Sequence, residues 1–385
     1  MTDKNGAEVL VEALRKEGVS QVFGISGHGV TVLLEAIRNS AGLGFVSPRH
    51  EESAAHMADG WARATGEVGV CVSTVGPGAV NQAAGLAEAY ADSIPVLAIT
   101  ANLQSFLSYP AVGFLEDMDS LNLYRPITKW NAVVHDRARI AELTQRAFRE
   151  ARTGRPGPVH LDIPLDIMCQ SGPASELPEP EFYRPTGRPR GDAESIERAL
   201  GLLDHAERPL LIAGGGVIAS EAWEEFRALA KKLGIPATTS PMGAGCLAPD
   251  GAGFFGDGGW LGGSAVIQAL NAADVVLAVG CRFSAWLGIG RPPVMAGAPP
   301  QKIIHVDIDP REIGKNVGVA VGIVGDAKAV LADMLAVVGT WADAGDKHEA
   351  WTRQLTAAYT EVHGESATKG SGGQADYYDL TSSKL

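Results

Sequence analysis

The sequence predicts an α/β protein with two doubly wound domains, each containing a parallel sheet covered by helices on both faces. Three observations lead to this prediction. Short apolar runs alternate with segments of helical length, a pattern typical of parallel sheets buried on both faces. The 47 glycines suit many tight turns between strands and helices. A chain of 385 residues with 45% apolar content is long enough to form two hydrophobic cores.

The composition argues against several classes of partner. A formal net charge of −13 disfavours nucleic acid and anionic membranes, because their partners need clustered basic residues. The four cysteines show no CxxC spacing, which favours reduced thiols in a cytoplasmic protein over a disulfide framework. The start, MTDKNGAEVL, lacks a secretory pattern, and no apolar run reaches about 18 residues. We expect a soluble cytoplasmic protein that binds neither nucleic acid nor membrane.

The first half of the chain predicts one complete doubly wound domain. Its first helix, residues 5–17, places Leu10 and Leu14 on one face and ends at Gly18. Strand and helix patterns then alternate. Residues 102–131 form a long connection, and loops of this length in compact domains are usually functional or disordered. The expected strands are 21–24, 43–47, 68–73, 95–100 and 158–163, and the expected helices are 5–17, 30–39, 52–64, 81–90 and 137–152.

A proline-rich, aperiodic stretch separates this domain from a second series of strands and helices. The fixed φ angles of its prolines make such a stretch semi-extended. The second series begins with strand 209–213 and helix 220–233, for which Ser220 is the expected N-cap. Further strands are expected at 235–239, 274–279, 302–308 and 319–324, and helices at 326–338 and 346–361. The predicted parts are a first domain (1–168), a linker (169–190), a central domain (191–340) and a mobile, polar tail (341–385).

The stretch PRHEESAAHMADGWARATG, residues 48–66, is the most informative part of the chain. It predicts an acid, Glu51, between the end of a strand and the start of a helix, where open α/β sheets place their ligands. Small side chains such as Ala54 and Ala58 let another backbone approach this helix closely. An alternative is that Glu51 is only a solvated acid stabilised by the helix dipole.

Residues 20–165 carry several motifs in order: VFGISGHG, PRHEESAAHMADGWARATG, STVGPGAVNQAAGLAEAYADSIPVLAIT, YRPITKW and GRPGPVHLDIP. Together they resemble the pyrimidine-binding domain of thiamine-diphosphate enzymes of the acetohydroxyacid synthase, pyruvate oxidase and benzoylformate decarboxylase group. The resemblance implies that Glu51 hydrogen-bonds the pyrimidine ring of thiamine diphosphate and promotes the imino tautomer that removes the thiazolium C2 proton. The cofactor would perform the chemistry, and protein groups would orient it.

The same resemblance assigns further residues of the first domain. The turn Gly76-Pro77-Gly78 would lie beside the pyrimidine, although an ordinary strand-to-helix turn explains its glycines equally well in isolation. The long connection would face the substrate channel, but Leu115 stands where the synthases have glutamine in a Phe-Gln-Glu run. The expected cofactor-binding residues are Gly27, Glu51, Gly76, Pro77, Gly78 and Asn81, and the expected substrate-channel residues are Phe114, Leu115 and Lys129.

His28 departs from the synthase pattern, which usually has glycine at the matching position. Pyruvate decarboxylases have aspartate and benzoylformate decarboxylase has serine at what looks like this position, where the side chain meets substrate. Histidine can act as acid and base near neutral pH, so His28 is a candidate catalytic residue beside Glu51. The alternative is a surface histidine that caps a glycine turn.

The second domain resembles the central domain of the same enzymes, which binds FAD or ADP in some members. Gly214-x-Gly216-x-x-Ala219 matches the dinucleotide pattern after a strand, although tight packing also explains its glycines. Two acids follow the matching Arg-Phe in the synthases, whereas Ser284 follows Phe283 here. The possible FAD or ADP site comprises Gly214, Gly215, Gly216, Arg282, Asp307, Asp309 and Asp326.

Full-length members of this group have a third domain, which binds the diphosphate through Mg²⁺ held by Gly-Asp-Gly and a later Asn. The tripeptide Gly256-Asp257-Gly258 occurs here without the expected strand, helix and Asn spacing, so we interpret it as a turn and predict no metal ligand in this chain. A second subunit is expected to supply this domain, in an α2β2 or higher hetero-oligomer. The predicted function is a subunit of a 2-oxo acid decarboxylase and carboligase similar to acetolactate synthase. A simple decarboxylase subunit and a non-catalytic nucleotide-binding or regulatory subunit remain alternatives.

Overall fold

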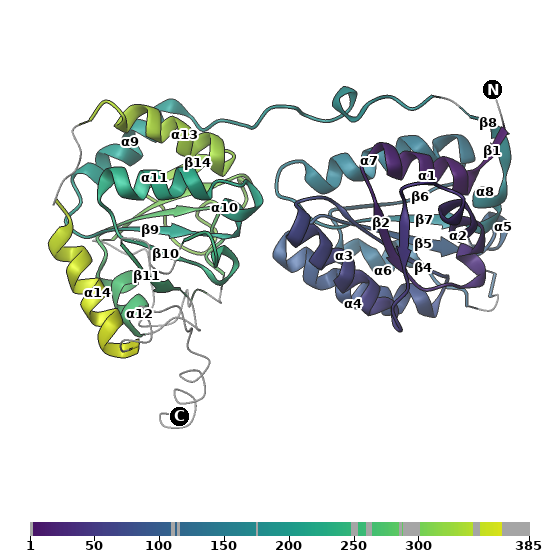
Figure 1. Cartoon of the computed structure of the whole chain (residues 1–385), viewed down its shortest axis with the longest axis horizontal. Coiled ribbons are helices and arrows are strands. Elements are labelled where there is room, and N and C mark those ends of the chain that lie inside the picture. Colours follow the sequence, from purple (N-terminus) through teal and green to yellow (C-terminus); the bar gives the residue numbers. More distant parts are fainter. Residues whose placement is uncertain are drawn as a thin grey trace. The chain divides into compact units, whose positions relative to one another are not determined.

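The computed structural model describes residues 3–108, 112–113, 116–174, 176–247, 253–258, 264–284, 287, 301–341 and 347–363. The chain divides into two compact units, Met1–Thr186 and Gly187–Leu385, which are described separately below (Figure 1). Each unit contains a six-stranded parallel sheet, which confirms the predicted fold class. Within the described residues, no helix has the length and apolar character needed to cross a membrane.

The sheet of the N-terminal unit has the strand order β3-β2-β4-β5-β7-β6. From β2, the next strand in sequence, β3, is added on one side of the sheet, and β4 is added on the other side. The topological switch point therefore lies between β2 and β4, where open α/β sheets bind ligands. The strands are β2 (Gln21–Gly24), β3 (Gly44–Val46), β4 (Gly69–Ser73), β5 (Val96–Asn102), β6 (Trp130–Val133) and β7 (Val159–Pro164). The helices are α1 (Gly6–Lys16), α2 (Thr31–Arg38), α3 (Glu51–Thr65), α4 (Pro77–Asp92), α5 (Ser105–Ser108), α6 (Ser120–Tyr124), α7 (Ile140–Arg152) and α8 (Leu165–Cys169).

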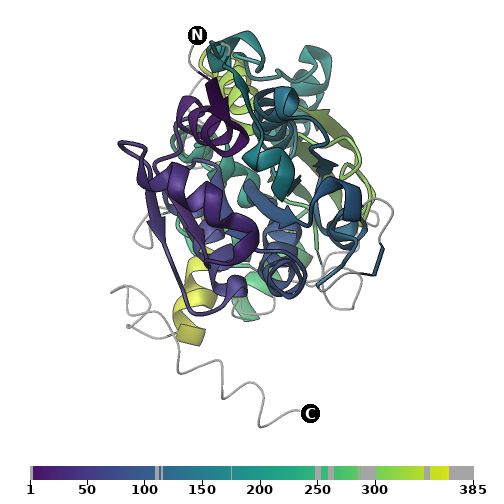
Figure 2. The ribbon, with the colours of Figure 1, turned by 90° about the vertical axis from the view of Figure 1, so that its right-hand side faces the viewer.

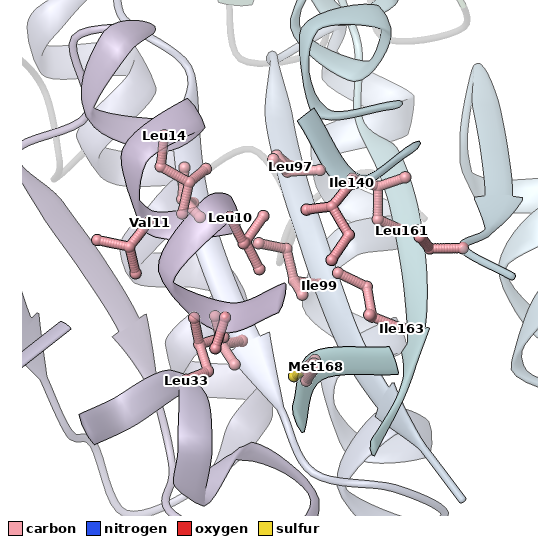
Figure 3. Close-up of a cluster of buried hydrophobic side chains, with 14 of the residues drawn as sticks. Leu10, Val11, Leu14, Leu33, Leu97, Ile99, Ile140, Leu161, Ile163 and Met168 are labelled. Carbon is pink, nitrogen blue, oxygen red and sulfur yellow. The ribbon is translucent and has the colours of Figure 1, made fainter. Parts of the chain in front are cut away.

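Helices cover both faces of this sheet, as Figures 1 and 2 show, with α1 and α7 on one face and α3 and α4 on the other. The alternation of side chains along each strand supplies both cores. On β5, Leu97 and Ile99 belong to the α1 side, whereas Val96 and Ala98 belong to the α4 side. Figure 3 shows Leu10 of α1 beside Ile99 of β5, with Leu161 and Ile163 of β7 farther along the same core.

The small side chains of α3 bring neighbouring backbones close, as the sequence predicted. A Cβ atom added to Gly69 of β4 would lie 2.0 Å from the carbonyl oxygen of Ala58. On α4, a Cβ atom added to Gly85 would lie 2.9 Å from Cβ of Ala55. This tight packing fixes α3 and α4 side by side, and the first turns of these two helices carry the residues discussed below.

Three parts of the N-terminal unit differ from the sequence prediction. The connection 102–131 contains α5 and α6 and leads into the edge strand β6, which the mixed sequence of Trp130–Val133 did not reveal. Helix α4 begins at Pro77, because proline is well suited to the first turn of a helix. The chain divides inside the predicted linker, and the first part of that linker forms β8 (Ser171–Pro173), which pairs antiparallel with β1 (Asp3–Asn5).

The later part of the predicted linker contacts the end of α1 through Glu17, whose side chain is completely buried. The hydroxyl of Tyr183 donates to Oε1 of Glu17 at 2.6 Å, and the guanidinium of Arg184 lies 2.9 Å from Oε2. Burial raises the pKa of Glu17, and these two partners oppose that rise. The linker is therefore bound to the N-terminal unit as far as Arg184.

The sheet of the C-terminal unit has the strand order β11-β10-β9-β12-β13-β14. Its strands are β9 (Pro209–Ala213), β10 (Ala237–Thr239), β11 (Phe254–Asp257), β12 (Val275–Val279), β13 (Lys302–Asp307) and β14 (Val321–Val324). Its helices are α9 (Ala193–Asp204), α10 (Gly215–Ala219), α11 (Trp223–Leu233), α12 (Ser264–Ala272), α13 (Ala327–Val338) and α14 (Glu349–His363).

One expectation for this unit was wrong. The helix predicted over 220–233 begins only at Trp223, as α11, and the short α10 precedes it, so Ser220 follows the end of α10 and does not cap α11. Its hydroxyl instead bonds Asp326, the N-cap of α13, at 2.8 Å. The helix expected at 346–361 is present as α14, in which Leu355 is buried and the indole of Trp351 donates to the carbonyl of Pro209 at 3.0 Å.

Candidate functional site

Glu51 is the first residue of α3, directly after the connection from β3. The preceding residue, His50, has extended backbone, and its Nδ1 accepts the backbone N–H of Glu52 at 3.3 Å. Two acids in the first turn suit the positive end of the helix dipole. The local sequence thus places a half-buried carboxylate near the carboxyl ends of the parallel strands.

Asn81 of α4 orients the Glu51 carboxylate. Its Nδ2 donates to Oε2 of Glu51 at 3.0 Å, and no described residue is seen donating to Oε1. A Cβ atom added to Gly78 would lie 3.4 Å from Oε1 and 2.9 Å from Cγ2 of Thr74. The glycine therefore leaves room beside the carboxylate. An oriented, half-buried carboxylate next to glycine backbone can accept a hydrogen bond from an amino group or a protonated nitrogen of a heterocyclic ring.

The turn before α4 requires glycine at Gly76, where φ is +61° and ψ is −115°. A Cβ atom there would also lie 2.6 Å from the carbonyl oxygen of Glu116. Pro77 follows as the first residue of the helix. The structure thus gives this turn a conformation that only glycine adopts readily.

Thr74 joins this turn to the turn that follows β2, and the sequence analysis did not identify it. Its Oγ1 accepts the backbone N–H of Gly29 at 3.3 Å. A Cβ atom added to Gly27 would lie 2.5 Å from Cβ of Thr74. Contacts through Thr74 therefore connect the Gly27-His28-Gly29 turn with Gly78, which lies beside Glu51. Only a contact between residues about 45 positions apart reveals this role, so no local sequence pattern could have predicted it.

Glu116 is a second residue that the sequence analysis did not select. Its carboxylate Oε2 lies 3.7 Å from Nδ1 of His28, and the two side chains are 31% and 58% exposed. The backbone of Glu116 has φ +64°, a strained value for a residue with a side chain. Glu116 thus contacts both the glycine of the α4 turn and the histidine of the first turn.

The structure does not bring all the predicted residues of this domain together. Lys129 lies before β6 and donates to the carbonyl of Thr153, after α7, at 2.9 Å. Its backbone N–H bonds the carbonyl of Pro158, which precedes β7. Lys129 is therefore at the amino ends of these strands, whereas the site lies at the carboxyl ends. Phe114 and Leu115 lie outside the described residues.

In the C-terminal unit, two glycines of the dinucleotide-like pattern pack closely against the backbone of Gly280. A Cβ atom added to Gly214 would lie 2.0 Å from the carbonyl oxygen of Gly280, and one added to Gly216 would lie 2.6 Å from Cα of Gly280. A Cβ atom added to Gly215 would lie 3.0 Å from Cβ of Met242. The following helix, α10, has only five residues.

The polar residues predicted for the nucleotide site bind other protein groups. Asp326 caps α13 and accepts from Arg188 at 3.0 Å. Asp309 pairs with Arg311 at 2.8 Å, and Asp307 accepts the backbone N–H of Asp309 at 2.9 Å. Arg282 contributes its carbonyl oxygen to Asn316, at 3.2 Å. These contacts give the described residues of this region a packing role.

The described residues contain no group of three or more His, Cys, Asp or Glu side chains placed to bind a metal ion. Gly256-Asp257-Gly258 spans the end of the edge strand β11, so the prediction that it forms a turn was wrong. The hydroxyl of Thr239 in the neighbouring strand donates to Oδ1 of Asp257. This contact ties the aspartate to the sheet.

Two protein families match the chain. The family described as "Thiamine pyrophosphate enzyme, N-terminal TPP binding domain" matches residues 4–122, and "Thiamine pyrophosphate enzyme, central domain" matches residues 196–334. A probable acetolactate synthase large subunit of Methanocaldococcus jannaschii is 44% identical over 338 residues, which are 86% of this chain and 56% of that protein. The acetolactate synthase large subunit of Haemophilus influenzae is 38% identical over 345 residues, which are 88% of this chain and 58% of the relative. That of Corynebacterium glutamicum is 39% identical, covering 86% and 52%. The chain thus spans little more than half the length of these relatives.

Proposed function

Because this chain belongs to the thiamine pyrophosphate enzymes and carries their N-terminal and central domains, we propose that it is a subunit of a thiamine-diphosphate-dependent enzyme that decarboxylates a 2-oxo acid and transfers the resulting acyl unit to an acceptor. The named activity of its relatives, acetolactate synthase, supports this proposal. Bound thiamine diphosphate supplies the carbanion at its thiazolium C2 atom.

The observation that supports this function best is the Glu51–Asn81 pair. Asn81 holds Oε2 of the carboxylate at 3.0 Å, and Gly78 keeps the space beside Oε1 open. Glu51 would bind the pyrimidine ring through Oε1 and hold a proton at the ring nitrogen. Asn81 would keep the carboxylate in the orientation that this contact needs.

We propose that His28 faces the substrate and moves a proton to or from it. Its exposed imidazole and its contact with Glu116 at 3.7 Å support this role. A glutamate at this distance keeps the ring near the turn. The competing interpretation is that His28 only completes the turn, and a prediction given below separates the two.

The direct test of the proposed function is Glu51→Gln, with Glu52→Gln as the matched control in the same helical turn. We expect the first variant to slow hydrogen–deuterium exchange at the cofactor C2 atom by about 10²–10⁴-fold, as for the loss of a proton-transfer partner. We expect the control to exchange like the native protein. Unchanged exchange in Glu51→Gln would leave a non-catalytic subunit as the better interpretation.

We also propose that a second subunit binds the diphosphate and Mg²⁺, in an α2β2 or higher hetero-oligomer. What supports this proposal is that the two matched domains are the N-terminal and central domains. Purified alone, this chain should show no turnover with thiamine diphosphate and Mg²⁺, and the subunit that co-purifies with it from its source should restore turnover. Turnover by the purified chain, or a longer native polypeptide, would contradict this proposal.

A simple 2-oxo acid decarboxylase is the second candidate function. His28 favours it, because the resemblance places polar side chains at this position in decarboxylases and glycine in the synthases. The products distinguish the two functions. A carboligase releases a condensed 2-hydroxy-3-oxo acid or acyloin, whereas a decarboxylase releases the free aldehyde.

A further inference from the structure

A layer of buried polar side chains lies beneath the first turn of α4, and Tyr124 is at its centre. Tyr124 is the last residue of α6 and is fully buried. Its hydroxyl donates to the carbonyl oxygen of Ala79 at 2.8 Å and lies 2.9 Å from Oε1 of Gln82. The hydroxyl of Ser73, at the end of β4, donates to the same Oε1 at 3.3 Å. Three elements therefore meet at the start of α4.

The ring of Tyr124 is held from the opposite side by His160 of β7. The two rings stack with centroids 3.9 Å apart and planes 10° apart. Burial lowers the pKa of His160 to about 3, so its imidazole is neutral. Nε2 of His160 lies 2.8 Å from Oγ1 of Thr100, whose only proton is donated to Oδ1 of Asp162 at 2.8 Å. His160 must therefore carry its proton on Nε2.

This layer continues into the connection that follows β5. Oδ2 of Asp162 accepts from Nδ2 of Asn102 at 2.6 Å and from the hydroxyl of Ser120, in the first turn of α6, at 3.1 Å. Both ends of α6 are thus bound to the sheet, one through Ser120 and the other through the stacked ring of Tyr124. Because both ends of α6 are fixed in this way, the Tyr124 hydroxyl has a defined position relative to α4.

The residues that Tyr124 contacts on α4 lie on either side of Asn81. Ala79 and Gln82 face the buried layer, whereas Asn81 faces Glu51. A shift of the first turn of α4 would move Asn81 and Gly78 together relative to the carboxylate. The position of this turn therefore decides whether the 3.0 Å contact between Asn81 and Glu51 forms.

We propose that Tyr124 is a positioning residue for the cofactor site, which acts by holding the first turn of α4 so that Asn81 meets Glu51. This inference depends on the function proposed above. It assigns no contact with the cofactor or substrate to Tyr124. A tyrosine that only stabilises the fold would leave the site geometry unchanged when its hydroxyl is removed.

The variant that tests this inference is Tyr124→Phe, which removes the hydroxyl and keeps the aromatic stack. Thr144→Val is the matched control, because Thr144 is equally buried and its hydroxyl also donates to a helix carbonyl, that of Ile140, at 2.8 Å. Thr144 lies in α7, on the other face of the sheet. Both variants should lower the unfolding stability to a similar extent.

Two measurements separate positioning from stability. In the native assembly with thiamine diphosphate and Mg²⁺, Tyr124→Phe should slow C2 hydrogen–deuterium exchange about tenfold, because small displacements of a positioning group can cost up to about 10²-fold. Without cofactor, amide hydrogen exchange of residues 80–83 should be faster in this variant. Thr144→Val should change neither quantity. Equal behaviour of the two variants would overturn the inference.

A double variant tests whether Tyr124 acts through Asn81. If it does, the double variant Tyr124→Phe with Asn81→Leu should show the same rate of C2 hydrogen–deuterium exchange as Asn81→Leu alone. Once the Asn81 amide is absent, misplacing it has no further effect. Multiplied effects would contradict the inference. If Tyr124→Phe does not fold, Gln82→Met removes the other side-chain partner and carries the same expectations. Failure of Glu51→Gln to slow exchange would refute the proposed function, whereas failure of these variants alone would refute only the positioning role.

Discussion

The contact between Asn81 and Glu51 gives the sharpest quantitative prediction. Asn81→Leu keeps a side chain of similar size and removes the Nδ2 donor that lies 3.0 Å from the carboxylate. Hydrogen bonds to charged groups contribute about 1.5–3 kcal/mol. The low end applies here because Glu51 is only half-buried. A loss of about 1.5 kcal/mol corresponds to roughly a tenfold lower rate.

The assay is the rate of C2 proton exchange in thiamine diphosphate, followed by NMR after rapid mixing with D₂O in the assembled enzyme. Glu88→Ala is the matched control, because Glu88 is an exposed residue of the same helix and pairs with His56, away from Glu51. We expect about tenfold slower exchange in Asn81→Leu and native exchange in the control. Native exchange in Asn81→Leu would show that the amide does not orient the carboxylate.

Three further predictions concern other parts of the chain. His28→Gly should lower turnover, preserve cofactor affinity and remove one limb of the pH–rate profile, and an unchanged profile would reduce His28 to a turn residue. His160 is neutral in the folded protein, with a pKa of about 3 against 6.5 in the unfolded chain, so folding stability is lost as pH falls below 6.5. This loss should reach about 2 kcal/mol at pH 5. In His160→Phe, the free energy of unfolding, measured with denaturant at each pH, should depend less steeply on pH than in the native protein. An equal pH dependence in the two proteins would contradict this origin. The freshly purified protein should show no flavin absorption, because backbone packing fills the glycine turn after β9, and a bound flavin would refute that interpretation.

The sequence predicted those parts of the fold in which local chemistry determines local structure. The apolar runs of β2, β9 and β12 are buried on both faces, and their predicted bounds differ from the observed ones by at most one residue. Edge strand β6 has half-buried residues throughout, so its pattern resembled a loop. Ser220 looked like a helix cap, but its hydroxyl bonds Asp326, more than 100 residues later in the chain. Tertiary contacts determined its role.

In the candidate site, too, local sequence patterns predicted some residues and tertiary contacts determined the others. Glu51 and the Gly76 turn could be predicted, because strand, turn and helix patterns place them without knowledge of the rest of the fold. Thr74, Glu116 and Tyr124 could not, because each acts through residues that are distant in the sequence. The glycines after β9 fit the dinucleotide pattern, yet they pack against Gly280. A local pattern cannot distinguish a ligand from another piece of backbone.

The contacts of the linker with Glu17 determine how much of it belongs to the N-terminal unit. Arg184 is bound to Glu17 of the N-terminal unit, and Arg188 is bound to Asp326 of the C-terminal unit. Pro185, Thr186 and Gly187 are the residues between these two anchors. The ring of Pro185 fixes one of their six backbone torsions, so five remain as degrees of freedom. Only three residues separate the two anchors, so one or two residues inserted here would lengthen the connection without disturbing either core.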